Sequence, residues 1–133
     1  MLVIDNQEKP PEYVKELVGL LPDGQSMVRA LPACDYLYCY HPSVGFEYHS
    51  EHTLVERKKV GDLISSFIER NANGERRLID QLKRGSRLAG KVILLVEGSL
   101  DPHLDPAWLW ASGRHRKFPY LAAQGLLLSL QTE

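Results

Sequence analysis

The amino-acid sequence predicts an α/β domain, and three observations indicate this fold class. Polar and apolar residues alternate in several short segments before Val60, as they do in the strands of a sheet. From Val60 onward, apolar residues recur at intervals of three and four, which is typical of a helix that packs on a sheet. The run "KVILLVE" (91–97) is apolar between its terminal charges and favours a strand covered on both faces. The 133 residues suit a single domain, residues 1–133, with one core.

The elements are placed by these periods and by the turn residues between them. Proline opens the first helix, and "NANG" (71–74) ends the second. The turn "HPSVG" (41–45) joins two strands into an antiparallel meander. In order, we expect a strand at 1–5, a helix at 10–24, strands at 26–31, 34–40 and 46–58, helices from 60 and from 75 to 88, a strand at 91–97, a loop or short helix at 105–119 and a closing helix at 120–131.

Composition excludes several classes of protein. The apolar fraction of 44% and the charged fraction of 25% are those of a soluble globular domain. Asp5 interrupts the N-terminus too early for a secretory signal, and no apolar run is long enough to cross a membrane. We therefore expect a cytosolic or nuclear protein that is not secreted. Cys34 and Cys39 lie five residues apart in a predicted strand, face opposite ways and are expected to stay reduced.

The net charge of −1 hides an uneven distribution of charge. Between Arg57 and Lys91 there are ten basic and four acidic residues. This excess is explained equally well by a solvated helix face and by an anion-binding surface.

One short stretch, "VERKK" (55–59), places charge at the end of a strand that should be buried. Glu56 and Lys58 are two residues apart and share one side of the strand, with Arg57 on the other. The carboxylate can hold a hard cation, and the ammonium can stabilise charge on a phosphate, as a metal-dependent phosphodiesterase requires. A surface strand with alternating charges also produces this pair by chance.

Three further carboxylates fall where the predicted sheet edge would bring them near Glu56: Asp5, Asp35 and Asp62. Each also has an ordinary interpretation, as a turn acid, a strand-start polar residue and a favourable charge near a helix N-terminus, respectively. Their combination with Glu56 and Lys58 favours chemistry.

These residues carry a family resemblance. The stretches that carry it, in chain order, are "VIDNQE" (3–8), "CDY" (34–36), "VERKKVGDLISS" (55–66), "RLIDQL" (77–82) and "ILLVEG" (93–98). Together they resemble the nuclease domain of the XPF family of structure-specific endonucleases over nearly the whole chain. The family pattern is G-D, a variable gap and E-R-K-x-x-x-D, and Cys34 stands here in place of the glycine. The resemblance implies a restriction-endonuclease-like core, a central mixed sheet with an antiparallel meander flanked by helices.

The resemblance also implies roles for individual residues in metal-dependent hydrolysis of a DNA phosphodiester with Mg²⁺ or Mn²⁺. Asp35 and Glu56 would be the principal metal ligands together with Asp5, and Lys58 the catalytic lysine, with Asp62 in the catalytic group. Glu8 and Arg57 would surround these ligands, with Arg57 holding the local fold or the phosphate. The expected contacts to DNA, in chain order, are Arg77, Gln81, Lys83, Arg84 and Arg87, followed by a second patch of Arg114, Arg116 and Lys117.

The expected partner is DNA, branched as a flap, fork or crossed junction, since no element is suited to reading base edges. The family domain usually continues past the closing helix, whereas this sequence stops at Glu133, so a homodimer and a larger nuclease assembly both stay open. A compact chain of this kind suits a prokaryotic, phage or viral source. The alternative is a catalytically silent or partner-dependent DNA-binding subunit. Silent members of the family lose the acidic residues and the lysine that this chain keeps.

Two other pairs of residues have open interpretations. His49 and His52 form a potential zinc pair, but two ligands do not make a site, and surface histidines are the simpler interpretation. Trp108 and Trp110 are either core residues or a wedge that stacks on unpaired bases.

Overall fold

The computed structural model describes residues 1–8, 11–39, 47–98, 108–110, 117–119, 125 and 127–130. Contacts divide the chain into two compact units. The first unit consists of Met1–Arg57 together with Asp80–Leu95, and the second of Lys58–Ile79 together with Val96–Glu133. The expectation of a single domain over residues 1–133 stays a prediction.

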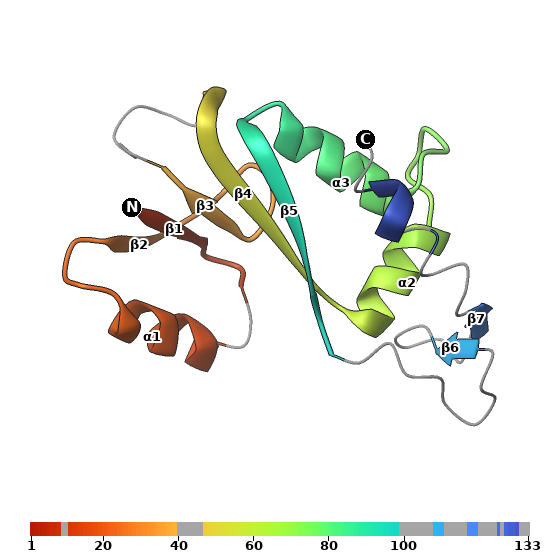
Figure 1. The fold of residues 1–133 in the computed structure, drawn as a ribbon, viewed down its shortest axis with the longest axis horizontal. Helices are drawn as coiled ribbons and strands as arrows, with labels where there is room; N and C mark the ends of the chain where they lie inside the picture. Colours follow the sequence, from red (N-terminus) through yellow and green to blue (C-terminus); the bar gives the residue numbers. More distant parts are fainter. Residues whose placement is uncertain are drawn as a thin grey trace. The chain divides into compact units, whose positions relative to one another are not determined.

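A five-stranded mixed sheet forms the centre of the fold (Figure 1). The strand order is β2-β1-β3-β4-β5. β1 pairs in parallel with β2 and antiparallel with β3, which pairs antiparallel with β4. The strands are β1 (Leu2–Asp5), β2 (Ser26–Arg29), β3 (Tyr36–Tyr38), β4 (His49–Lys59) and β5 (Ala89–Glu97). The expected α/β class, with an antiparallel meander in a mixed sheet, is confirmed.

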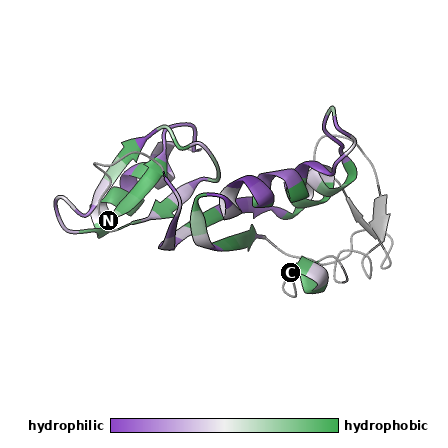
Figure 2. Cartoon of the chain, turned by 90° about the horizontal axis from the view of Figure 1, so that it is seen from above, coloured by the Kyte–Doolittle hydropathy of each residue, from purple (hydrophilic) through white to green (hydrophobic). Residues whose placement is uncertain are grey.

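Three helices follow the predicted ranges closely: α1 (Pro11–Leu20), α2 (Val60–Ile68) and α3 (Arg77–Ser86). α1 supplies the crossover that the parallel pair β1 and β2 requires, and it begins at a proline, whose fixed φ suits a first helical turn. α2 starts directly after β4 and buries Leu63 and Ile64. Figure 2 shows α3 mostly in the hydrophilic colour. A five-stranded mixed sheet flanked by helices is consistent with a restriction-endonuclease-like fold.

The core of the first unit is built on one face of the sheet. Val3, Leu37 and Leu54 lie opposite one another on β1, β3 and β4, and we call them the apolar row. Their side chains are 0%, 5% and 1% exposed, respectively. Removing a leucine of this kind from water contributes about 2 kcal/mol, so this row is a main source of stability. The residues that complete the cluster or pack against it are Cys39, Ala89, Met27, Leu31, Cys34, Leu88 and Val92.

Two expectations for the C-terminal part of the chain were wrong. β5 was expected to be covered on both faces, but it is the last strand in the sheet order, and Ile93 and Leu95 are 38% and 50% exposed. A continuous apolar run predicts a hydrophobic strand, but it does not predict whether that strand lies in the middle or at the edge of its sheet. The segment 105–119 was expected to be a loop or short helix, yet it contains β6 (Trp108–Trp110) and β7 (Lys117–Pro119), which pair antiparallel.

The remaining expectations concern the hairpin turn and the end of the chain. The turn at 41–45 lies outside the described residues. The closing helix is helical at Gly125 and at 127–130, the positions described there. Among the described residues, no helix combines the length and the apolar character that a membrane span requires.

Candidate active site

Three acidic residues lie next to the end of the pairing of β1, β3 and β4. Asp5, Asp35 and Glu56 are each one residue beyond the last antiparallel pairs, Ile4–Tyr36 and Tyr36–Val55. Asp5 N donates to Asp35 O (2.8 Å), and Asp35 N donates to Val55 O (3.0 Å), so Asp35 lies between Asp5 and the residue that precedes Glu56. We call Asp5, Asp35 and Glu56 the acidic row.

Asp5 and Glu56 each lie two residues from a member of the apolar row, Val3 on β1 and Leu54 on β4. Since side chains alternate along a strand, these two carboxylates share the face of the apolar row. Asp35 immediately precedes β3. Glu56 is only 5% exposed, next along β4 to the buried Leu54. Carboxylates are seldom buried beside a hydrophobic core, and ionisable groups in such places are often functional, so the position of Glu56 favours a functional role.

Backbone amides hold two members of the acidic row in place. The N–H of Leu31 donates to Oδ1 of Asp5 (2.9 Å), and the N–H of Gln7 donates to Oδ2 of Asp5 (3.3 Å). Asp35 accepts a hydrogen bond at Oδ2 from the N–H of Arg57 (2.7 Å). Asp5 therefore also acts as a turn acid at the end of β1. Its role as a metal ligand stays a prediction.

Arg57 and Glu8 form a buried ion pair. Arg57 donates from Nε (3.2 Å) and Nη2 (2.5 Å) to Oε1 of Glu8, and the two side chains are 14% and 4% exposed. The guanidinium carbon lies 5.6 Å from the ring centroid of Tyr13 on α1. Burial and then the charge of Glu8 raise the pKa of Tyr36. Of the two roles expected for Arg57, these contacts favour holding the local fold.

Lys58 and Asp62 belong to the second compact unit. Lys58 follows Glu56 on β4 with one residue between them, so alternation gives the two side chains the same face of that strand. Its side chain is buried, with 8% of the residue exposed. Asp62 is exposed in the first turn of α2, where the helix dipole favours an acid. The catalytic roles of both residues stay predictions.

Cys34, which stands where the family pattern has glycine, keeps a glycine-like backbone. Its φ is +62°, and no other non-glycine residue in the described part of the chain has a positive φ. Burial, followed by the charges of Glu56 and Asp35, raises the pKa of this thiol to about 12, so it stays protonated and is not a nucleophile. The sequence identified Cys34 as a departure from the pattern but did not reveal its left-handed backbone.

The donor set of the acidic row suits a hard divalent cation, because all its ligand atoms are carboxylate oxygens. Within the described residues, no group of three or more His, Cys, Asp or Glu side chains is already arranged to hold a metal ion. Asp35 and Glu56, each next to the Tyr36–Val55 pair that ends the pairing of β3 with β4, are the two carboxylates best placed to begin such a site.

The expected DNA contacts on α3 differ in their surroundings. Arg77 forms an ion pair with Glu69 (Nη1 to Oε2, 2.7 Å), and Arg84 forms one with Asp80 (Nε to Oδ2, 3.4 Å). Oε1 of Gln81 is buried and has no hydrogen-bond partner within the part of the chain that the structure describes. Lys83, Arg84 and Arg87 are exposed. Arg114 and Arg116 lie outside the described residues, and of Lys117 only the backbone in β7 is described.

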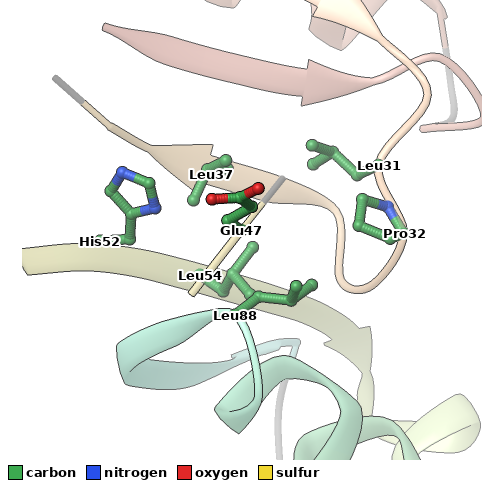
Figure 3. A pocket seen from close by; sticks show the side chains of 7 residues that line it. All are labelled: Leu31, Pro32, Leu37, Glu47, His52, Leu54 and Leu88. Atoms are coloured by element: carbon green, nitrogen blue, oxygen red, sulfur yellow. The ribbon is translucent and has the colours of Figure 1, made fainter. Parts of the chain in front are cut away.

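A small hollow in the first unit contains no member of the acidic row (Figure 3). The side chains that line it are Leu31, Pro32, Leu37, Glu47, His52, Leu54 and Leu88. Its volume of about 10 Å³ has room for about one water molecule. The His49 and His52 rings stack with centroids 4.8 Å apart, and burial and then the neighbouring His49 lower the pKa of His52. Among the described side chains, no group that could hold a metal includes this pair.

Comparison with known proteins identifies the family of the chain. The family model described as the ERCC4 domain matches residues 4–132, which is almost the whole sequence. No curated protein and no solved structure matched the chain. The matched range includes the acidic row, Lys58 and Asp62. The chain therefore belongs to the ERCC4-domain family, that of the XPF-type nucleases.

Proposed function

We propose that this protein is a metal-dependent endonuclease that hydrolyses phosphodiester bonds near branches in DNA, in repair, recombination or replication. The observation that carries the proposal is the acidic row. Asp5, Asp35 and Glu56 lie next to the end of the antiparallel pairing of three strands, beside a hydrophobic core, and Lys58 follows Glu56 by two residues on β4. A family match over residues 4–132 supports a nuclease.

In this proposal, Asp35 and Glu56, with Asp5, hold Mg²⁺ or Mn²⁺. A bound divalent cation of this kind supplies an activated water and neutralises charge on the phosphate. The ammonium of Lys58 stabilises the negative charge that develops on the phosphoryl oxygens during attack. Asp62 adds a further carboxylate to the catalytic group. Arg57 and Glu8, joined by their ion pair, support β4 from its other face.

DNA binding is proposed to use cations rather than base-reading groups. The exposed side chains of Lys83, Arg84 and Arg87 can neutralise phosphates on either side of the cleaved bond. The remaining proposed contacts are Arg77, Gln81, Arg114, Arg116 and Lys117. Contacts of this kind recognise the shape of a junction rather than its sequence. We propose no oligomeric state beyond the open alternatives of a homodimer and a larger nuclease assembly.

A second candidate is a DNA-binding subunit that cuts only with a partner. The observation that favours it is that the carboxylates of Asp5 and Asp35 already accept hydrogen bonds from backbone amides. A metal ion has to compete with these donors or share the oxygens with them.

The test uses labelled flap, fork, four-way-junction and plain duplex DNA with Mg²⁺, Mn²⁺ or EDTA. We expect metal-dependent cuts near the branch, and a loss of about 100- to 1,000-fold in Lys58→Ala, because one preorganised charge at a transition state contributes that much. Lys59→Ala is the matched control, since Lys59 is the exposed neighbour on the same strand. Binding of branched DNA without cutting would move the assignment to the partner-dependent subunit. Equal cutting by Lys58→Ala and the wild type would refute the role of Lys58.

A further inference from the structure

We infer that Glu8 is a positioning residue for Asp35, whose carboxylate it orients through Arg57. Glu8 holds the side chain of Arg57, and the backbone amide of Arg57 holds Asp35. The part of this inference that concerns metal binding rests on the proposed function. The orientation of Asp35 itself does not depend on it.

Four residues form a closed ring of hydrogen bonds. Oδ2 of Asp35 accepts from the N–H of Arg57 (2.7 Å), whose side chain donates from Nε (3.2 Å) and Nη2 (2.5 Å) to Oε1 of Glu8. The N–H of Glu8 donates to the carbonyl oxygen of Asp5 (3.1 Å), and the N–H of Asp5 donates to that of Asp35 (2.8 Å). The ring therefore joins two of the proposed metal ligands, Asp5 and Asp35, to the ion pair.

Asp35 bridges two positions on β4. Its N–H donates to the carbonyl oxygen of Val55 (3.0 Å), and its Oδ2 accepts from the N–H of Arg57, two residues further along the strand. The direction of the Asp35 carboxylate therefore depends on the backbone at Arg57. That backbone is restrained through its side chain, because two donors of the guanidinium bind Glu8 and its carbon lies 5.6 Å from the ring centroid of Tyr13.

Stability alone does not explain an ion pair at this place. The side chains of Glu8 and Arg57 are 4% and 14% exposed, and the cost of removing two charges from water offsets much of their attraction. Replacing such a pair by apolar side chains of similar volume is often neutral or stabilising. Apolar side chains lack the directional hydrogen bonds of an arginine fork, however, and these bonds fix geometry. We therefore assign the pair to the orientation of the amide that Asp35 accepts.

The first test needs no metal and follows amide hydrogen exchange by NMR. Glu8→Gln should raise the exchange rate of the Arg57 amide about 3- to 10-fold relative to the other amides of β4, the range that one hydrogen bond supports. Leu54→Ala, which weakens the core under the whole sheet, is the control and should raise the β4 amides together. An equal rise along β4 in Glu8→Gln, or an Arg57 amide that is unprotected in the wild type, would overturn the positioning role.

The second test measures Mn²⁺ binding to the intact, nucleic-acid-free protein by electron paramagnetic resonance, so that cleavage is not the readout. We expect Glu8→Gln to bind Mn²⁺ about 2- to 10-fold more weakly, as loss of one orienting hydrogen bond predicts. Glu12→Gln is the matched control, because it removes the same charge from the exposed surface of α1, and it should bind as the wild type does.

A double variant separates positioning from stability. Glu8→Leu combined with Arg57→Met replaces both charges by apolar groups, so the protein should stay folded and its net charge is unchanged. We expect it to bind Mn²⁺ as weakly as Glu8→Gln does. Wild-type affinity in the folded double variant would overturn the metal part of the inference. If wild-type protein binds no Mn²⁺ but Glu8→Gln selectively speeds exchange of the Arg57 amide, the proposed metal site fails while the positioning of Asp35 stands.

Discussion

The apolar row and the acidic row lie two residues apart along β1 and β4, yet they have different roles. The apolar row is almost completely buried and stabilises the first unit. In the acidic row, backbone amides hold the carboxylates of Asp5 and Asp35 in place. The comparison shows that a shift of two residues along a strand is enough to pass from the hydrophobic core to the candidate active site. The buried core holds the strands rigid, and the same strands carry the neighbouring carboxylates.

The largest difference is expected between substitutions of Leu54 and Glu56, which lie two residues apart on β4. Leu54→Ala should lower the free energy of unfolding by about 2–5 kcal/mol, because it leaves a cavity in the core. The protein that remains folded should still cut DNA. Glu56→Gln should have the opposite profile, with cleavage lost and the urea midpoint nearly unchanged. The measurements are urea unfolding and cleavage per folded molecule. A folded Glu56→Gln protein with wild-type cleavage would remove the distinction between the rows.

The ion pair on the other face of β4 gives the next effect. Glu8→Gln should destabilise the protein by about 3 kcal/mol, because it leaves the guanidinium of Arg57 buried without its counter-charge. Glu12→Gln, the same change on the exposed surface of α1, is the control and should have little effect. The check is the urea midpoint of each variant. Equal midpoints for the two variants would show that the Arg57 pair does not stabilise β4.

The two cysteines allow a smaller and more specific contrast. Cys39→Gly should cost about 2 kcal/mol, because it removes a fully buried side chain and adds chain entropy to the unfolded state. Cys34→Gly should change stability by less than about 1 kcal/mol, because relief of the left-handed strain offsets the lost packing. Thermal or urea unfolding of both variants tests this. A cost for Cys34→Gly as large as that for Cys39→Gly would mean that its backbone carries little strain.

The smallest effect concerns pH and His52, which lies two residues before Leu54 on β4 and lines the hollow. Its pKa in the folded protein is below the ordinary value of 6.5, so the unfolded state takes up a proton first as the pH falls. The contribution of the neutral His52 ring to the free energy of unfolding is therefore present above about pH 6.5. It is lost as the pH falls through the pKa of His52 in the folded protein. Urea unfolding between pH 7.5 and pH 5.5 should show this slope, and His52→Gln should reduce it. An identical slope in His52→Gln would assign the effect to other groups.

Much of the fold was predictable from local pattern. The strands β1 to β5 and the helices α1 to α3 fall close to the segments that polar and apolar periodicity indicated. The errors came where pattern gives no information about neighbours. The run of β5 is equally apolar in a central strand and in the last strand of a sheet, and the aromatic segment that became β6 has no periodicity long enough to show its pairing with β7.

The sequence by itself determined the chemical groups, the spacing of Glu56 and Lys58 on one strand and the identity of the family. These depend only on the order of residues along the chain. The tertiary structure decided that Asp5, Asp35 and Glu56 come together beside the end of the antiparallel pairing and that Arg57 pairs with Glu8. The hydrogen bonds and the ion pair that show this join residues at least twenty positions apart. Local periodicity carries no information about register across strands, so only the folded sheet settles which carboxylates meet.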